Sequence, residues 1–277
     1  MLGKLIKHEF RATARIMLPV MGALLALALL ANLSMRGLTG GASDITALRL
    51  IFILIVVFFG IGIVVTAVMA LVIMVSRFYR NLLKDEGYLM FTLPADVHEL
   101  VWSKLIVSLV WFLATALLIF LVLSLTAINL SATNLEMIIE GFPKWSEIRS
   151  FLSENGILGQ VNTLFFQCIL GVLLATLVTC LHFYASMALG HMFSKSKILL
   201  SIVFFVGISF LFNLTEMGYG IVGFSVTDPT GWDSFSNVEG LRFMSAVLWH
   251  GIALGAVQGA ILYLATVLGL KHGLNLE

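Results

Sequence analysis

The side chains best suited to chemistry are concentrated in one segment, from Arg77 to Lys104. Arg80 and Lys84 follow Arg77 at helical spacing, so the three cations share one face of a predicted helix. The charged run that starts at Lys84 ends at Gly87, which can stop or kink a helix, and Pro94 breaks the chain again. This pattern predicts a short amphipathic helix followed by a turn.

Two kinds of chemistry fit this segment. An interfacial helix would place Phe78, Tyr79 and Trp102 at the level of the lipid headgroups and its cations against anionic lipid. A docking helix would present the same charged rim to a cytosolic partner. Asp96 is a candidate cap for the helix that follows. Both interpretations require an amphipathic, charge-rimmed helix, and the residues alone leave both open.

Few ionisable residues occur elsewhere in apolar sequence. His182 and His250 lie inside apolar runs, and Glu216 lies at the outer end of another. Neither histidine has a carboxylate one turn away on its own helical face, whereas ion-coupled carriers need carboxylates or other polar groups near the membrane midplane. We interpret each histidine as hydrogen-bonded or facing water, and a secondary carrier ranks third among the hypotheses.

The sequence lacks the groups that intramembrane catalysis requires. The apolar runs contain no acidic pair for a protease and no His-Glu arrangement for a metal. The one Gly-Lys dipeptide, Gly3-Lys4, has no upstream loop to hold phosphates, so the chain does not bind ATP by a P-loop. Cys168 and Cys180 are too far apart on one helix to form a disulfide. We therefore expect no catalytic, metal-binding or cofactor-binding residues.

The elements that position these residues are membrane helices. Of the 277 residues, 60% are hydrophobic and 11% are charged, against roughly a quarter charged in soluble domains. The net charge of +1 gives no field that would attract nucleic acid. The predicted fold is an all-α bundle, one domain over residues 1–277 with six spans. These spans cover approximately residues 17–33, 50–75, 105–128, 164–189, 198–214 and 243–270.

The distribution of cations predicts the orientation of the bundle. Lys and Arg accumulate on the cytoplasmic side of membrane proteins. With the N-terminus inside, most of the 16 Lys and Arg residues face the cytoplasm, and so do both chain ends. The first and fifth runs are close to the minimum length of ~20 residues for a span.

The segment before the first run predicts a helix that lies in the membrane interface. Leu2, Leu5, Ile6 and Phe10 fall on one face, opposite cationic residues. A cleaved signal peptide is the less favoured interpretation, because this segment is long and contains Glu9.

Two long polar segments are predicted outside the membrane. In residues 129–162, Pro143 and Gly156 bracket a predicted short helix. Residues 215–242 are rich in glycine and contain Asp228-Pro229, which favours turns or a re-entrant excursion over regular structure.

The last apolar run contains a face of small residues. Gly251, Gly255 and Gly259 recur at every fourth position, so another helix can approach closely there. Packing within the chain is the favoured interpretation, and dimerisation through this face stays open.

The charged segment also resembles a known family. It is similar to the first cytoplasmic loop of membrane permease subunits of type-2 ABC exporters, especially those of Gram-positive bacteria. The similarity covers Lys84 to Pro94, with the sequence Lys-Asp-Glu-Gly-Tyr-Leu-Met-Phe-Thr-Leu-Pro, and Trp102-Ser-Lys104. The opening residues Leu5 to Thr13 and the closing Leu274 to Glu277 are similar as well.

This resemblance implies a dimeric exporter domain in a bacterial plasma membrane, with a second permease subunit that is either identical (a homodimer) or different (a heterodimer). It implies a cytosolic ATP-binding subunit that holds ATP and magnesium and receives a coupling helix of this chain. Peptides, antibiotics or other hydrophobic compounds would be the substrates. The implied docking residues are Arg80, Lys84, Asp85, Glu86, Gly87, Tyr88, Leu93 and Pro94. The alternative is a membrane scaffold or accessory protein that recruits a soluble partner without transport.

Overall fold

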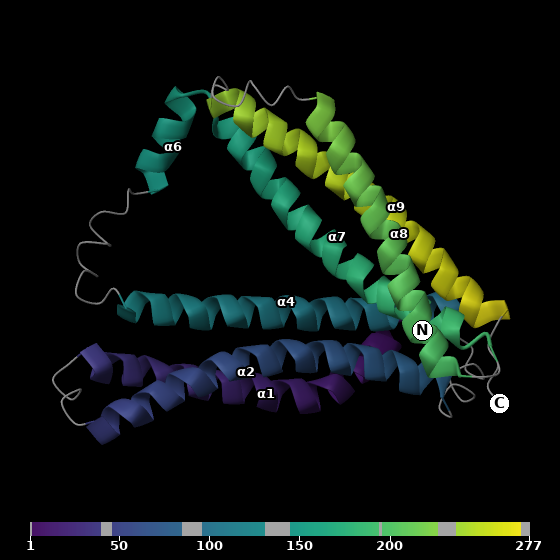
Figure 1. Cartoon of the computed structure of the whole chain (residues 1–277), viewed down its shortest axis with the longest axis horizontal. Helices are drawn as coiled ribbons and strands as arrows, with labels where there is room; N and C mark the ends of the chain where they lie inside the picture. The colour runs from purple at the N-terminus through teal and green to yellow at the C-terminus, as the bar shows by residue number, and fades with distance from the viewer. Residues whose placement is uncertain are drawn as a thin grey trace. The chain divides into compact units, whose positions relative to one another are not determined.

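The computed structural model describes residues 2–39, 46–84, 96–130, 145–193, 196–226 and 237–272. All regular structure within these ranges is helical (Figure 1). Six of the helices are long and apolar enough to span a membrane, which confirms the predicted all-α membrane protein. They are α1 (Leu2–Thr39), α2 (Thr46–Phe78), α4 (Val97–Leu130), α7 (Leu158–Gly190), α8 (Lys197–Val226) and α9 (Asn237–His272).

The helices are longer than the apolar runs that predicted them. At about 1.5 Å per residue, the 30 residues of α8 extend roughly 45 Å, more than the ~30 Å hydrocarbon core of a bilayer. The helix of the fifth span, α8, is therefore long enough to cross the hydrocarbon core. Helix α1 runs from Leu2 without a break through Pro19, so the segment predicted to lie in the interface belongs to the same helix as the first span.

The predicted short helix between Pro143 and Gly156 is confirmed as α6 (Trp145–Glu154). Its end is closed by Gly156 at a φ of +66°, a conformation that glycine adopts without steric cost. The N–H of Ile157 donates to the carbonyl of Leu152, and the N–H of Gly156 donates to that of Ser153. These two bonds satisfy carbonyls that the helix end would otherwise leave unpaired.

The prediction of irregular backbone over residues 215–242 is wrong at both ends. Helix α8 continues to Val226 and α9 already starts at Asn237. Glycine costs a helix only about 1 kcal/mol, and a membrane rewards continuous backbone hydrogen bonding, so the glycines of this segment did not stop α8. Residues 227–236, which include Asp228-Pro229, lie outside the described residues.

The helices divide into two compact units. The first contains α1, α2 up to Arg77 and α4 from Ile106 onward. Its core holds α1 against α2 and α4 through two apolar clusters centred on Met17 and Leu24. Trp111 of α4 donates its indole N–H to the Thr13 hydroxyl of α1 at 2.8 Å.

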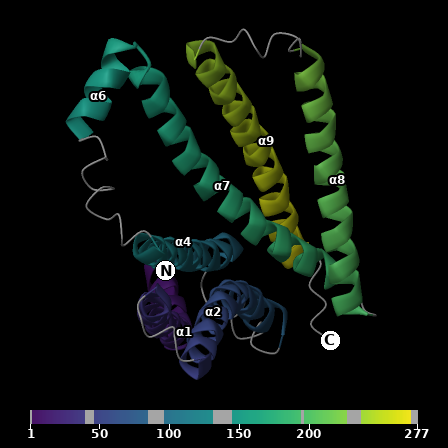
Figure 2. The same cartoon turned by 60° about the vertical axis from the view of Figure 1, so that its left-hand side comes forward.

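The second unit contains residues 78–105 and 144–277, and α7 is its central helix. Gly255 faces Leu174, Gly259 faces Val178, and Gly269 faces Ala188, so the residue numbers rise together along both helices. Helices α7 and α9 therefore run parallel and in contact, and α7 also contacts α8 (Figure 2). Many large apolar side chains of all six long helices remain exposed, as lipid-facing surfaces require.

Candidate functional site

The candidate docking segment, residues 77–104, begins with a π-helical turn, η2 (Tyr79–Leu83), which directly extends α2. Single π-helical turns in α-helices often mark functional sites. Three side chains of the turn are buried: Asn81, Leu82 and Leu83. Arg80 and Lys84 are exposed, four residues apart. The turn thus buries Asn81 together with two leucines, whereas the cations Arg80 and Lys84 are exposed.

Aromatic contacts hold this turn against the end of α7. Phe78 stacks on Tyr184 with ring centroids 4.0 Å apart and an interplanar angle of 9°. Both rings are buried, with exposed fractions of 0% and 1%. Tyr79 packs edge-on against His191 at 5.4 Å. Such pairs contribute about 0.5–1.5 kcal/mol beyond their burial, so the turn is firmly attached to α7.

The far end of the docking segment is attached to α9. The carbonyl of Asp96 accepts the N–H of Leu100 at 3.2 Å, which places Asp96 at the start of α4 as predicted. His98 Nδ1 lies 2.7 Å from the Tyr263 hydroxyl, and its Nε2 lies 3.5 Å from Lys271 Nζ. Both ring nitrogens of His98 thus lie within hydrogen-bond reach of side chains on α9.

Of the predicted docking residues, the structure describes only Arg80 and Lys84. Asp85, Glu86, Gly87, Tyr88, Leu93 and Pro94 lie outside the described residues. The sequence reasoning did not find Tyr184 and His191 as partners of the segment. Their spacing of seven residues places both on one face of a helix. This spacing is the sequence signal that could have indicated that both contact the same neighbouring segment.

The glycines of the predicted packing face differ in their surroundings. A Cβ on Gly255 would lie 3.2 Å from Leu174, and one on Gly259 would lie 3.3 Å from Val178. Both glycines thus permit the close approach of α9 to α7 within the chain. Gly251 has open space around its missing Cβ and borders a cavity instead.

The two intramembrane histidines are hydrogen-bonded. His182 Nε2 lies 3.1 Å from the Phe205 carbonyl and 3.3 Å from the Ser209 hydroxyl, and its ring stacks on Phe205. His250 Nδ1 lies 2.7 Å from the Ala246 carbonyl. His182 therefore joins α7 to α8, whereas His250 is exposed and bonds to the backbone of its own helix.

Among the described residues, no group of three or more His, Cys, Asp or Glu side chains could hold a metal ion. Cys168 and Cys180 are both free thiols, in agreement with their predicted separation along α7. Comparison with protein-family models, with curated proteins and with solved structures gives no match to this chain.

His191, which follows the last residue of α7, makes the attachment of the docking segment sensitive to pH. Burial lowers the pKa of His191, the hydrogen bond from its Nδ1 to the Met187 carbonyl at 2.9 Å partly offsets this, and the nearby Lys197 lowers it further. In the unfolded chain the same side chain binds a proton below about pH 6.5, so the folded state loses stability as the pH falls through that value.

We expect the apparent Tm of the detergent-solubilised protein to fall between about pH 7.5 and about pH 5.5. The variant His191→Asn keeps an N–H donor at the position of Nδ1 for Met187 but cannot be protonated, so its Tm should fall less over the same range. A scanning fluorimetry series at matched ionic strength measures both slopes. Equal slopes for the two proteins would show that His191 does not titrate in the unfolding transition.

Proposed function

We propose that this chain is the membrane subunit of an ATP-driven exporter, and that a soluble ATP-hydrolysing subunit docks on residues 77–104. The observation that carries the proposal is the attachment of both ends of this segment. Phe78 and Tyr79 hold its start to α7, and His98 holds its end to α9. A partner that moves the segment therefore pulls directly on two membrane helices.

The resemblance of Lys84 to Pro94 and Trp102 to Lys104 to the first cytoplasmic loop of type-2 ABC permease subunits supports the same function. On this proposal the segment faces the cytoplasm of a bacterial cell, both chain ends lie on that side, and residues near the N-terminus rest in the interface. The partner holds ATP and magnesium, and a second permease subunit completes the transporter. The transported compounds are peptides, antibiotics or other hydrophobic molecules.

A charge exchange in the docking segment tests this proposal. Lys84→Glu combined with Glu86→Lys preserves the net charge but reverses the pattern offered to the partner. Such an exchange places like charges opposite each other at the interface, which costs several kcal/mol. We expect ATP turnover of the reconstituted complex to continue while export per ATP falls roughly tenfold or more.

The matched control exchanges an equivalent pair on α6, Glu147→Lys with Arg149→Glu, and should leave export unchanged. Unchanged export and unchanged ATP turnover in the Lys84 and Glu86 variant would contradict the docking assignment. If the chain forms no complex with an ATPase encoded beside it, that result would favour the alternative function, a membrane scaffold that recruits a soluble partner without transport.

A further inference from the structure

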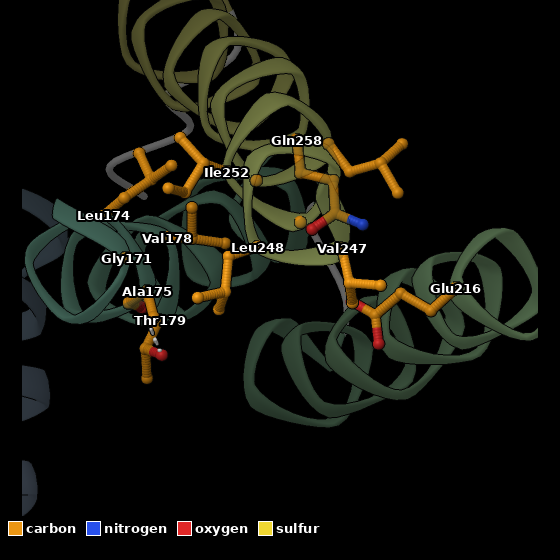
Figure 3. A pocket seen from close by; sticks show the side chains of 13 residues that line it. Gly171, Leu174, Ala175, Val178, Thr179, Glu216, Val247, Leu248, Ile252 and Gln258 are labelled. Carbon is orange, nitrogen blue, oxygen red and sulfur yellow. Dashed lines mark hydrogen bonds between the residues drawn. The ribbon is translucent and has the colours of Figure 1, made fainter. Parts of the chain in front are cut away.

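A cavity of about 560 Å³ lies between α7, α8 and α9 (Figure 3). This volume is within the range of small-molecule sites, about 300–1,000 Å³. Its walls are predominantly aliphatic, with contributions from Leu174, Val178, Val247, Leu248 and Ile252. All three helices belong to the second compact unit, so the cavity is a feature of that unit alone.

Three polar side chains interrupt the aliphatic wall, one from each helix. Glu216 of α8 points toward α9, and it is the one charged residue among the described residues that line the cavity (Figure 3). Gln258 of α9 carries a buried Nε2 with no hydrogen-bond partner in the described part of the chain. Thr179 of α7 donates its hydroxyl hydrogen to the Ala175 carbonyl at 2.8 Å, which leaves its oxygen able to accept.

The structure agrees with the position that the sequence assigns to Glu216. The membrane-spanning stretch of α8, Lys197–Met217, ends one residue beyond it, although the helix itself continues to Val226. Gly190 of α7 faces Ser201 of α8 and His182 contacts Phe205, so these two helices run in opposite directions. Glu216 lines the same cavity as residues 171–179 of α7. Its side chain is exposed, and an ionisable group at the end of an apolar span that borders a cavity is a candidate ligand-binding group.

We propose that this cavity binds a hydrophobic cation that also carries a hydrogen-bond acceptor. The cavity lining supplies no cation for Glu216, so a positively charged ligand would complete the pair. The aliphatic walls strengthen this attraction because they lower the local dielectric constant, and they bury the apolar body of the ligand. The Gln258 amide can turn to a ligand acceptor without giving up a hydrogen bond at Nε2. This binding site supplies a ligand class for the proposed exporter but does not depend on ATP-driven export.

Fluorescence anisotropy of rhodamine 6G tests the site directly. This probe is a hydrophobic cation with an ester carbonyl, and the experiment uses the full chain in phosphatidylcholine nanodiscs, without any ATPase. We expect saturable binding above the signal of empty nanodiscs. Tetraphenylphosphonium should compete with the probe, whereas tetraphenylborate, which has a similar shape and a negative charge, should not.

Two variants locate the binding site. Glu216→Gln should weaken rhodamine 6G binding by about tenfold or more, because it removes the charge and keeps the shape. Gln258→Leu should weaken it by roughly three- to tenfold, the effect of one hydrogen bond. The control Glu154→Gln removes an equivalent charge from the exposed end of α6 and should leave the affinity unchanged.

A third variant keeps the test decisive if Glu216→Gln does not fold. Gly251 borders the cavity with nothing within 4 Å of its missing Cβ, so Gly251→Leu is expected to fold, fill the cavity and abolish binding. Binding that is equal in wild type, Glu216→Gln and Gly251→Leu would overturn the proposal, as would equal competition by tetraphenylborate. Because no ATPase is present, these outcomes are independent of the docking experiment.

Discussion

Replacing Gly190 with alanine is expected to lower the stability of the protein more than any other single methyl group added to α7. A Cβ at this position would lie 2.5 Å from the backbone nitrogen of Ser201 and 2.7 Å from its Cα. These are backbone atoms of α8, so no side-chain rotation relieves the overlap. Overpacking of this kind costs about 1–3 kcal/mol, and occasionally more.

The expected result is a clear fall in the apparent Tm, together with broadened size-exclusion profiles in detergent. Gly159→Ala is the matched control, because it adds the same methyl group to the same helix at a position with nothing within 4 Å. Gly159 lies in the first turn of α7, so this control should be neutral or slightly stabilising, since alanine has the higher helix propensity. Equal Tm values for both variants would contradict the close approach of α7 to α8.

Phe78→Ala is expected to have the second large effect, since it removes the ring that attaches the docking segment to α7. Both Phe78 and its stacking partner Tyr184 are buried, and a buried phenylalanine replaced by alanine typically costs about 3–5 kcal/mol. Part of this cost is the cavity left beside Tyr184. Denaturant unfolding of the purified chain measures the change in free energy.

The control for this variant is Phe166→Ala, which truncates an exposed phenylalanine of α7. Because the Phe166 ring faces outward, its loss should change the unfolding free energy by less than about 1 kcal/mol. Under the proposed function, Phe78→Ala should also reduce export per ATP hydrolysed, whereas Phe166→Ala should not. A similar loss of stability in both variants would remove the special role of the Phe78 and Tyr184 stack.

The six long helices and α6 could be predicted from the sequence because each depends on local patterns. A membrane requires that backbone groups pair within a segment, so an apolar run of sufficient length already implies a helix. The helix ends were harder to predict. Hydropathy falls at Leu214, but hydrogen bonding continues to Val226, since polar residues and glycine at the end of a span do not by themselves break a helix.

The candidate sites depend on contacts that no local pattern contains. The spacing of Arg80 and Lys84 indicated an exposed cationic face, and both side chains are exposed. The pairing of Phe78 with Tyr184 and of His98 with Tyr263 joins segments more than one hundred residues apart, so it follows only from the packing of helices. The sequence placed Glu216 at a span end, but its position on the wall of a cavity with α7 and α9 likewise follows only from helix packing.

The close approach at Gly190 also gives α7 the properties of a lever. Its close approach to α8 lies at Gly190, Tyr184 stacks on Phe78 of the docking segment nearby, and Gly171 lies on the cavity wall farther along. The 19 residues from Gly190 to Gly171 span about 28 Å, so a tilt of about 10° at Gly190 displaces the wall by roughly 5 Å. That displacement is comparable to the width of an aliphatic chain, so under the proposed function a small rotation of α7, driven from residues 77–104, would change the width of the cavity.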